Sequence, residues 1–590
     1  MTNGQIRNAA EVYIKNEKNT GFRKEVEDLL SSENWAELGD RFYRDLEFGT
    51  GGIRGILGGG FNRMNTFVVA RATQGLANYV TSVTENKNPS AVIAFDSRHY
   101  SDIFAQTAAE VLCGNGIRVY LFSGLRPTPE LSFAVRYFKA DLGIVVTASH
   151  NPKTYNGYKV YWSDGGQVVP PHDTGIIAEV LSVGNDIRYL AKETALKENL
   201  LNVVDREVDG PYNRMIINHA LRPEVINRHK SSFTAVYTPL HGAGRKPVEE
   251  VFRELGIRLI TVPEQREPDG NFPTVAFPNP EEASALDMAI TLAKKEKAGI
   301  VLGTDPDSDR LGVAVPDPVS GEWVLLSGNQ TGSMLAEYML STLAEQNRLP
   351  RNPVIIKTIV TTELQRKIAE AYGVRTCDVL TGFKYIAEKI REFESTGENY
   401  IFGGEESYGY LVGTEVRDKD AVSAAAMVAE LALYCLDKKM SLLDYLGSLY
   451  KKYGCFKELL ISRSFPGQEG MIRMKKFMES LRSAPPAVLG GLKVKLIKDY
   501  NSGETLETAT GRKEKIDLPK SDVLQFRLEG ETVISVRPSG TEPKLKFYAS
   551  ARKAVSDGLE KAGREVTARL SEIEASILLL IDDFNRQETG

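Results

Sequence analysis

The stretch LGIVVTASHNP, from Leu142 to Pro152, is an apolar run that stops abruptly at a polar loop. Its composition is that of a buried strand, and the proline cannot continue such a strand. The same pattern recurs in AVIAFDSR (91–98), FTAVYTPLHGAG (233–244), AGIVLGTDPDSDR (298–310), VIIKTIVTT (354–362) and YIFGGEESYG (400–409). Helical segments separate these runs. The alternation predicts α/β layers, in which ligand sites form beyond the carboxyl ends of the strands.

The chain has 590 residues and too many irregularly spaced strand–helix units for one sheet. The first ~45 residues are helical in pattern, with apolar residues at near-helical spacing; these are Val26, Leu29, Leu30 and Trp35. The last segment differs, because its strands lie close together and helices follow them. We predict four domains, at 1–207, 208–320, 321–452 and 453–590.

Composition narrows the class of protein. The net charge is −5, which gives no electrostatic footprint for nucleic acid. The four cysteines are far apart, so neither a zinc site nor a disulfide framework is expected; they are Cys113, Cys377, Cys435 and Cys455. The start lacks the apolar core of a secretory signal, and the segment from Ala421 to Cys435 contains Glu430 and is too short to span a membrane. We expect a soluble, cytoplasmic protein with that segment as a buried helix.

The loop from Gly303 to Arg310, GTDPDSDR, carries three aspartates at alternate positions. They are Asp305, Asp307 and Asp309. An extended backbone would place all three on one side, where they repel one another unless a cation lies between them. A calcium loop needs glycine at its sixth position and glutamate at its twelfth, where this chain has Arg310 and Pro316. The pattern favours Mg²⁺ over the alternative of a solvated acidic turn.

A second loop, RPSGTEP, lies between strand-like segments. Arg537 can hold two phosphate oxygens, Ser539 and Thr541 add hydroxyls, and Gly540 lets backbone N–H groups approach an anion. An ordinary hairpin turn is the open alternative, because Pro-Ser-Gly is turn chemistry.

Three further loops give weaker signals. Glu405 and Ser407 in GGEESYGY are spaced to share hydrogen bonds with vicinal sugar hydroxyls, although such a pair is common in glycine-bounded loops. Lys384 stands in TGFKYI, and a lone lysine in such a loop is more often a solvated one. Arg54 stands in FGTGGIRG, whose glycines match neither the dinucleotide-binding spacing nor the Walker spacing. An arginine in such a flexible glycine-rich loop is suited to binding a phosphate.

Ser149 and His150 stand side by side in TASHN, which is not the GxSxG elbow of a serine hydrolase. Neighbours in an extended chain point to opposite sides, so they are expected to make a poor nucleophile–base pair. A serine near a metal loop and phosphate-binding loops is better explained as a phosphoryl carrier. A turn serine is the alternative.

Together these loops resemble those of the α-D-phosphohexomutase family, which includes phosphoglucomutases and phosphomannomutases. The motifs occur in order along nearly the whole chain, as GTGGIRG, TASHNP with NGYK, DPDSDR, TGFK, GEES and RPSGTEP. RFYRDLEFGTGGIRG and EESYGY are most similar to the longer phosphoglucomutase branch. The resemblance implies a heart-shaped molecule of three related α/β domains and a C-terminal α+β domain that can rotate, with the active site in the central cleft.

The resemblance also implies residue roles. Ser149 is expected to be the phosphoserine and to bind Mg²⁺ together with the three aspartates. Glu405 and Ser407 are expected to bind sugar hydroxyls. The distal phosphate is expected to be held by Arg537, Ser539, Gly540 and Thr541. Five residues match positions that line the cleft: Arg54, His150, Lys159, Arg310 and Lys384. Lys159 is the preferred general base and acid, if Arg54 and Arg310 lower its pKa, and His150 is the alternative.

These roles imply an intramolecular phosphotransferase that interconverts glucose 1-phosphate and glucose 6-phosphate through a phosphoserine and glucose 1,6-bisphosphate, which also acts as activator. Sugar phosphates are the expected partners, with no nucleic acid or membrane, and the chain is expected to be a monomer or homodimer. Phosphopentomutase, phosphomannomutase and glucose-1,6-bisphosphate synthase remain alternatives within the family. A catalytically silent sugar-phosphate-binding protein is the alternative of another class.

The sugar-binding loop departs from the pattern of the shorter bacterial members. Tyr408 stands where they carry glycine, and Tyr410 where they carry histidine. Their dual specificity for glucose and mannose phosphates is therefore not expected to transfer directly to this chain.

Overall fold

A computed structural model describes residues 1–49, 51–465, 467–539 and 544–589. By internal packing the chain divides into two units, each described by itself. The first comprises Met1–Thr331, Glu345–Val354 and Phe383–Ser441, and the second comprises Gly332–Ala344, Ile355–Gly382 and Leu442–Gly590.

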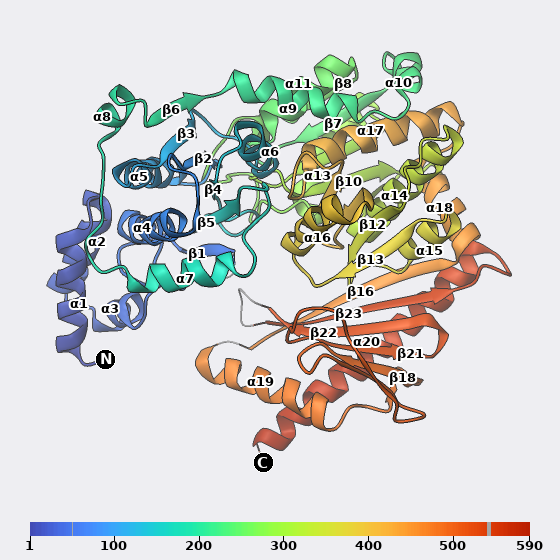
Figure 1. Cartoon of the computed structure of the whole chain (residues 1–590). Coiled ribbons are helices and arrows are strands. Elements are labelled where there is room, and N and C mark those ends of the chain that lie inside the picture. The colour runs from blue at the N-terminus through green and yellow to red at the C-terminus, as the bar shows by residue number, and fades with distance from the viewer. Residues whose placement is uncertain (50, 466, 540–543, 590) are drawn as a thin grey trace. The chain divides into compact units, whose positions relative to one another are not determined.

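The first sheet of the first unit has the strand order β1-β5-β4-β2-β3-β6 (Figure 1). Its strands are β1 (Gly52–Ile56), β2 (Ser90–Phe95), β3 (Arg118–Phe122), β4 (Leu142–Val146), β5 (Tyr155–Trp162) and β6 (Leu201–Val204). β3, β2 and β4 run parallel, so their carboxyl ends meet at one edge. β5 is antiparallel to both β4 and β1. The loops after β2 and β4 therefore lie next to each other.

Helices cover both faces of this sheet. Alternate residues of a strand point to opposite faces, and both sets are apolar in the central strands, so each face needs its own cover. Ile93 packs in a core with α4 (Thr66–Val83) and α5 (Ser101–Gly114), whereas Val92 packs in another with α6 (Thr128–Phe138). Two further helices belong to this region, α7 (His172–Ser182) and α8 (Lys192–Lys197). The central strands β2 and β4 are buried on both faces, as their continuous apolar runs predict.

The N-terminal segment is helical, as its apolar spacing predicts. It forms α1 (Asn3–Asn16), α2 (Thr20–Ser31) and α3 (Trp35–Phe42). Val26 is fully buried in a small core, and the other predicted apolar residues pack against that core. The buried carboxylate of Glu17 accepts hydrogen bonds from the hydroxyls of Tyr13 and Thr66 and from the backbone N–H of Phe67. The segment is thereby attached to the first turn of α4.

The second sheet of the first unit has the order β11-β10-β9-β7-β8. Its strands are β7 (Thr234–Thr238), β8 (Arg258–Thr261), β9 (Ile300–Thr304), β10 (Leu311–Pro316) and β11 (Trp323–Leu326). The helices of this region are α9 (Arg206–Asn218), α10 (Pro223–His229), α11 (Arg245–Leu255), α12 (Pro263–Arg266) and α13 (Ala283–Glu296). β9 is parallel to β7 and antiparallel to β10, so the aspartate loop is a tight connection between paired strands.

The first unit also contains α16 (Phe383–Thr396), the antiparallel pair β14 (Asn399–Gly404) and β15 (Tyr410–Val412), and α17 (Ala421–Asp437). The predicted buried helix from Ala421 to Cys435 is confirmed, since α17 buries nearly all of its side chains. None of the helices in the described part of the chain is long and apolar enough to cross a membrane.

The second unit holds most of α14 (Gly328–Glu345) and β12 (Pro353–Thr358), together with α15 (Leu364–Ala371), β13 (Arg375–Val379) and α18 (Leu442–Tyr453). Its main sheet has the order β16-β23-β22-β21-β18-β19-β20, with β17 beside β18. The strands are β16 (Cys455–Ser464), β17 (Val488–Leu489), β18 (Leu492–Asp499), β19 (Glu504–Glu507), β20 (Lys513–Lys515), β21 (Leu524–Leu528), β22 (Thr532–Pro538) and β23 (Lys544–Lys553). A short 3₁₀ helix, η1 (Glu529–Glu531), precedes β22, and α19 (Gly467–Ser483) and α20 (Leu559–Thr589) complete this α+β region.

Candidate functional site

Ser149 lies three residues beyond β4, in a loop that side chains from β2's carboxyl end hold in place. The backbone N–H of Ser149 donates to Thr147 Oγ1 at 2.8 Å, and Thr147 Oγ1 donates to Asp96 Oδ2 at 2.6 Å. Ser149 has a φ of 51°, in the left-handed region, and only 3% of it is exposed. The serine is therefore held in one orientation.

Arg98, two residues after Asp96, supports the same loop. Its guanidinium donates to the backbone carbonyls of Pro152 at 2.8 Å and Tyr155 at 3.0 Å, and also to those of Ser149 and Asn151. Burial lowers the pKa of Arg98, while the Asp96 carboxylate raises it. A single buried arginine thus satisfies four carbonyl oxygens of the serine loop.

The aspartate loop brings its three carboxylates together, as predicted, but not by the expected geometry. One carboxylate oxygen from each aspartate lies within 4.8 Å of the others. The loop is a turn rather than an extended segment, and Ser308 within it has a φ of 55°. Asp305 Oδ1 accepts from the backbone N–H groups of Asp309 and Arg310, at 3.1 and 3.0 Å. The turn therefore gathers the carboxylates by closing on Asp305.

The serine and aspartate loops meet directly. Ser149 Oγ donates to Asp305 Oδ2 at 2.6 Å. At the start of α6, Thr128 Oγ1 donates to Asp307 Oδ2 at 2.9 Å. Since the two loops follow strands of different sheets, this contact joins the first two α/β layers at their carboxyl edges.

Two lysines neutralise part of this acidic cluster. Lys159 Nζ, on β5, lies 2.8 Å from Asp307 Oδ2 and 3.3 Å from Asp309 Oδ2. Lys419 Nζ lies 3.2 Å from Asp309 Oδ2. Burial opposes ionisation of Asp309, but Lys419 and Lys159 outweigh it and lower its pKa. In contrast, burial and the neighbouring carboxylates raise the pKa of Asp305 well above its usual range.

The carboxylates fit a divalent cation. Asp307 Oδ1 and Asp309 Oδ1 are buried and accept no hydrogen bond. Buried carboxylate oxygens without donors are costly, and a hard cation satisfies them with the oxygen ligands that it prefers. With the Ser149 hydroxyl beside Asp305, this all-oxygen donor set suits a hard divalent cation.

Two expectations about the general base need correction. Ser149 and His150 are in contact, with 3.2 Å between Ser149 Oγ and His150 Nδ1, because the left-handed serine breaks the extended geometry that would separate them. Burial and the cations Arg310 and Arg54 lower the pKa of His150 well below its usual range. Burial disfavours the charged form of Lys159, but the attraction of Asp307 and Asp309 is stronger. The pKa of Lys159 is therefore raised, not lowered as expected.

The predicted arginines lie around the same cluster. Arg54, on β1, donates to Asn151 Oδ1 at 2.8 Å, and burial lowers its pKa. Arg310 pairs with Glu281, and this carboxylate raises its pKa against the effect of burial. Both guanidiniums are partly buried, and they lie close enough to His150 to lower its pKa.

The turn between β14 and β15 carries Glu405 and Ser407. Glu405 is buried and lies near enough to Arg310 and Lys419 to raise the pKa of each. Tyr410 is 1% exposed, and its hydroxyl donates to the Gly328 carbonyl at 3.1 Å. The tyrosine that replaces histidine is thus part of the core.

Lys384 stands at the start of α16, with Nζ 3.9 Å from Asp173 Oδ2. Burial lowers its pKa, whereas Asp173 raises it. A solvated lysine, the alternative reading, does not fit this half-buried position.

In the second unit, Arg537 lies on β22 and its guanidinium donates to the Thr381 hydroxyl. The backbone N–H of Ser539 donates to the Lys544 carbonyl at 2.7 Å, as expected of a hairpin between β22 and β23. Gly540 and Thr541, also predicted to hold phosphate, lie outside the described residues.

Several residues of the site were missed by sequence reasoning. Asp96 and Arg98 stand at the end of AVIAFDSR, which was interpreted only as a strand. The polar residues that end this run are a signal for a ligand site, because such sites form beyond the carboxyl ends of strands. Thr128 and Lys419 lie in segments without a motif, so nothing local distinguished them.

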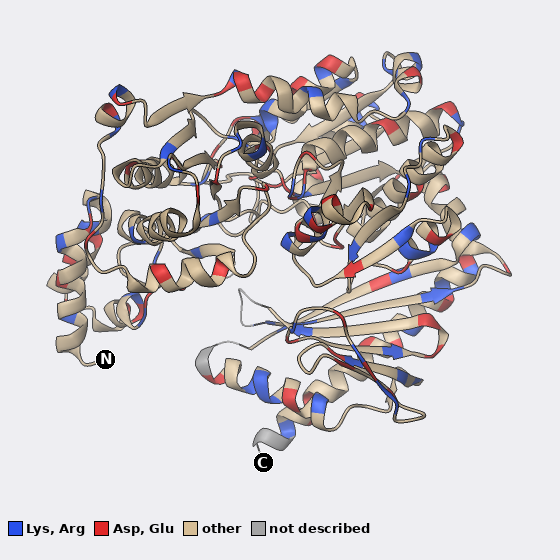
Figure 2. Cartoon of the chain, viewed as in Figure 1, with Lys and Arg blue, Asp and Glu red and all other residues tan. Residues whose placement is uncertain are grey.

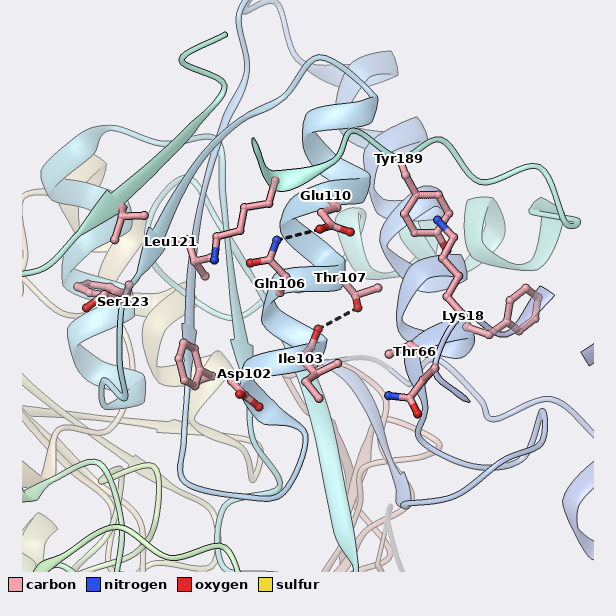
Figure 3. A pocket seen from close by; sticks show the side chains of 16 residues that line it. Lys18, Thr66, Asp102, Ile103, Gln106, Thr107, Glu110, Leu121, Ser123 and Tyr189 are labelled. Carbon is pink, nitrogen blue, oxygen red and sulfur yellow. Dashed lines mark hydrogen bonds between the residues drawn. The ribbon is translucent and has the colours of Figure 1, made fainter. Parts of the chain in front are cut away.

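A cavity of about 620 Å³ lies elsewhere in the first unit, over the outer face of α5 (Figure 3). Gln106 Nε2 donates to Glu110 Oε1 at 2.9 Å on its floor, and Lys18 Nζ lies 3.0 Å from the centre of the Tyr189 ring. None of the predicted site residues lines this cavity.

Family comparisons match three consecutive parts of the chain. They are described as phosphoglucomutase/phosphomannomutase alpha/beta/alpha domains I, II and III, at residues 45–194, 211–320 and 327–453. The chain is 35% identical to a phosphoglucomutase of Staphylococcus haemolyticus, over 89% of this chain and 93% of that protein. It is 37% identical to a phosphoglucomutase of Staphylococcus aureus strain MRSA252, over the same shares of the two chains.

Solved structures share the fold at lower identity. Parafusin, a phosphoglucomutase from Paramecium in its open form, superposes with a TM-score of 0.66 and 15% identity, over 90% of this chain and 96% of its own. A phosphoglucomutase/phosphomannomutase family protein from Burkholderia thailandensis gives 0.64 and 20%, over 91% and 97%. With its three matched domains, its C-terminal α+β region and these relatives, the chain belongs to the α-D-phosphohexomutase family.

Proposed function

We propose that this enzyme is a phosphoglucomutase that interconverts glucose 1-phosphate and glucose 6-phosphate through phospho-Ser149 and glucose 1,6-bisphosphate. One observation carries the proposal: the Ser149 hydroxyl lies 2.6 Å from Asp305, inside a cluster of three carboxylates. The identity of the substrate rests on the relatives named phosphoglucomutase, which are 35 to 37% identical over 89% of the chain.

In this proposal, Asp305, Asp307, Asp309 and an oxygen on Ser149 hold Mg²⁺. When bound, the cation supplies positive charge beside the transferring phosphoryl group. The cationic side chains of Arg54 and Arg310 add to that charge from the protein itself. Lys159 remains a cation, because its contacts with Asp307 and Asp309 favour the charged form.

Each half-reaction exchanges one phosphorus–oxygen bond for another. The bond to Ser149 Oγ breaks, a bond to the free sugar hydroxyl forms, and the hydroxyl proton ends on Ser149 Oγ. The reverse transfer returns the other phosphate to the serine. His150 is favoured as the group that relays this proton, because it is near Ser149 Oγ and its lowered pKa keeps the ring neutral.

We assign the sugar hydroxyls to Glu405 and Ser407. Arg537, Ser539, Gly540 and Thr541 are proposed to bind the non-reacting phosphate. Lys384 is proposed to line the active-site cleft that the family resemblance implies. Glucose 1,6-bisphosphate is proposed as activator because it rephosphorylates Ser149 when the intermediate escapes. The four domain boundaries, the cytoplasmic location, the absence of a nucleic-acid partner and the monomeric or dimeric state stay predictions.

The test compares wild type with Ser149→Ala for conversion of glucose 1-phosphate, with Mg²⁺ and a trace of glucose 1,6-bisphosphate. Mannose 1-phosphate and ribose 1-phosphate are assayed in parallel. The proposal requires glucose turnover that the substitution abolishes. Faster ribose or mannose turnover would reassign the substrate, and no turnover of any sugar would favour a silent binding protein. Bisphosphate made from an acyl phosphate donor would identify a synthase.

A further inference from the structure

The second unit contains a cavity of about 960 Å³ that the proposed mutase chemistry does not use. One wall is formed by α15, β13 and the segment after β12, and the other by β18, β21 and the hairpin of β19 and β20. None of the residues assigned to the proposed active site lines it. Its size falls within the range of small-molecule pockets.

Strand register places two cations side by side on one wall. Lys498 pairs with Gln525, and Leu496 pairs with Arg527, in the antiparallel ladder of β18 and β21. Residues two apart on a strand share a face, so Lys498 and Arg527 are diagonal neighbours. Figure 2 colours the Lys and Arg positions of this unit blue. Gln525 on the same face donates to the Ile359 carbonyl at 3.0 Å, which fixes this wall against the segment after β12.

The carboxylates on the opposite wall already have partners. Lys357 Nζ lies 3.1 Å from Glu363 Oε1 and 3.2 Å from Asp378 Oδ1. Arg366 pairs with the same two carboxylates, at 2.8 and 2.5 Å. This quartet of two cations and two anions is balanced, and its one ion pair with the facing wall is the long contact of 3.9 Å between Glu363 and Arg527.

The facing wall is rich in cations without close partners. Among the described residues, Lys495, Lys498 and Lys515 form no ion pair within 4.0 Å, and Arg527 has one contact, 3.9 Å from Glu363. Burial and the repulsion of Arg527 lower the pKa of Lys498. Two further lining carboxylates already have cationic partners: Glu514 pairs with Arg512, and Glu531 pairs with Arg552 and with the lining Lys367.

Among the described residues that line the cavity, Asp517 is the single carboxylate without an ion pair. The same lining has three lysines without an ion pair and Arg527, whose one ion pair is long, so positive charge is in excess. An anion between Lys498 and Arg527 would relieve their repulsion, and a guanidinium offers paired donors that fit phosphate oxygens. Ile516 and Leu518 add apolar surface beside these charges, suited to the carbon skeleton of an organic ligand.

We propose that this cavity binds a phosphorylated small molecule, with a phosphate between Lys498 and Arg527. The site is distinct from the proposed active site, and its occupation does not require the mutase reaction.

The test uses inorganic pyrophosphate as probe, titrated calorimetrically into the full chain with EDTA present. Every chain carries Arg537→Ala, which weakens the proposed active-site phosphate loop. Adding Lys498→Gln and Arg527→Gln is expected to weaken pyrophosphate binding by at least about tenfold, because two charge-assisted contacts are lost. The matched control adds Lys493→Gln and Arg564→Gln, which remove equal charge from the same unit outside the cavity. It is expected to bind within about twofold of its parent.

Equal binding by the Lys498/Arg527 and control chains would overturn the proposal, as would an absence of binding to the parent at about 1 mM pyrophosphate. In an otherwise wild-type chain, Lys498→Gln with Arg527→Gln is expected to retain sugar phosphate turnover. That assay shows that the variant folds, and it separates failure of this inference from failure of the proposed function.

Discussion

Arg98 Nη1 lies 2.8 Å from the backbone carbonyl oxygen of Pro152, 54 positions further along the chain. This contact is one of four between the same guanidinium and the serine loop. Because β2 and β4 run parallel, the residues that follow them meet at one edge. The position of the proposed phosphoserine, Ser149, therefore depends on a residue to which the proposed mechanism gives no chemical role.

Replacing Arg98 by lysine is expected to lower kcat by about tenfold or more, with a smaller change in KM. An ammonium group cannot serve four carbonyls in one plane, so the serine loop loses its fixed orientation. Steady-state kinetics measures the split between kcat and KM. Arg118→Lys, at an exposed position on β3, is the control and is expected to behave as wild type. Unchanged kcat in Arg98→Lys would show that the loop holds its shape without the guanidinium.

Divalent metal is expected to stabilise the first unit. Adding Mg²⁺ at about 100 times its dissociation constant should contribute about 2.7 kcal/mol, because the folded carboxylate cluster binds it and the unfolded chain does not. Thermal unfolding with Mg²⁺ or EDTA measures the shift. Asp307→Asn is expected to lose most of it, whereas Asp317→Asn, in an exposed turn, should retain it. An equal shift in all three proteins would place the cation elsewhere.

Glu458 gives the second unit a predicted pH dependence. Burial raises its pKa to about 7, and hydrogen bonds from Thr362 and Ser550 only partly oppose this. A raised carboxyl pKa contributes stability below the unfolded value of about 4.3, and the contribution is lost as pH rises through about 7. Glu458→Gln should therefore be more stable than wild type at pH 8, by at most about 3.7 kcal/mol and by less because Glu458 is only partly buried, and similar to it at pH 4.

Thermal unfolding across this pH range provides the measurement for Glu458. Glu572→Gln, at an exposed position on α20, is the matched control and should follow wild type at every pH. If Glu458→Gln also follows wild type, the carboxyl ionises freely in the folded protein.

The N-terminal helices are expected to depend on Glu17. Glu17→Ala leaves several buried donors without an acceptor and should destabilise the attachment of α1 to α4 by about 3–5 kcal/mol. Limited proteolysis should then cleave near residue 17 faster than in wild type. Glu27→Ala, on the exposed side of α2, is the control. Equal cleavage of the two variants would contradict the role of Glu17.

Sequence patterns predicted the strands, the buried helix α17 and the members of the aspartate cluster, because apolar runs and local charge are properties of neighbouring residues. The backbone at two loops was not predictable in this way. Ser149 and Ser308 both adopt left-handed conformations, which change where the flanking side chains point. Arg98 and Lys419 join the site through strand order and long-range packing, which no single motif records.

The backbone angle of Ser149 also limits which residues evolution can place there. A φ of 51° suits glycine, asparagine and aspartate better than a β-branched side chain. Threonine, the replacement that keeps the hydroxyl, therefore meets a conformational barrier, whereas glycine, asparagine and aspartate meet less strain. Mutational drift at this position leads to loss of the hydroxyl more readily than to its retention on threonine.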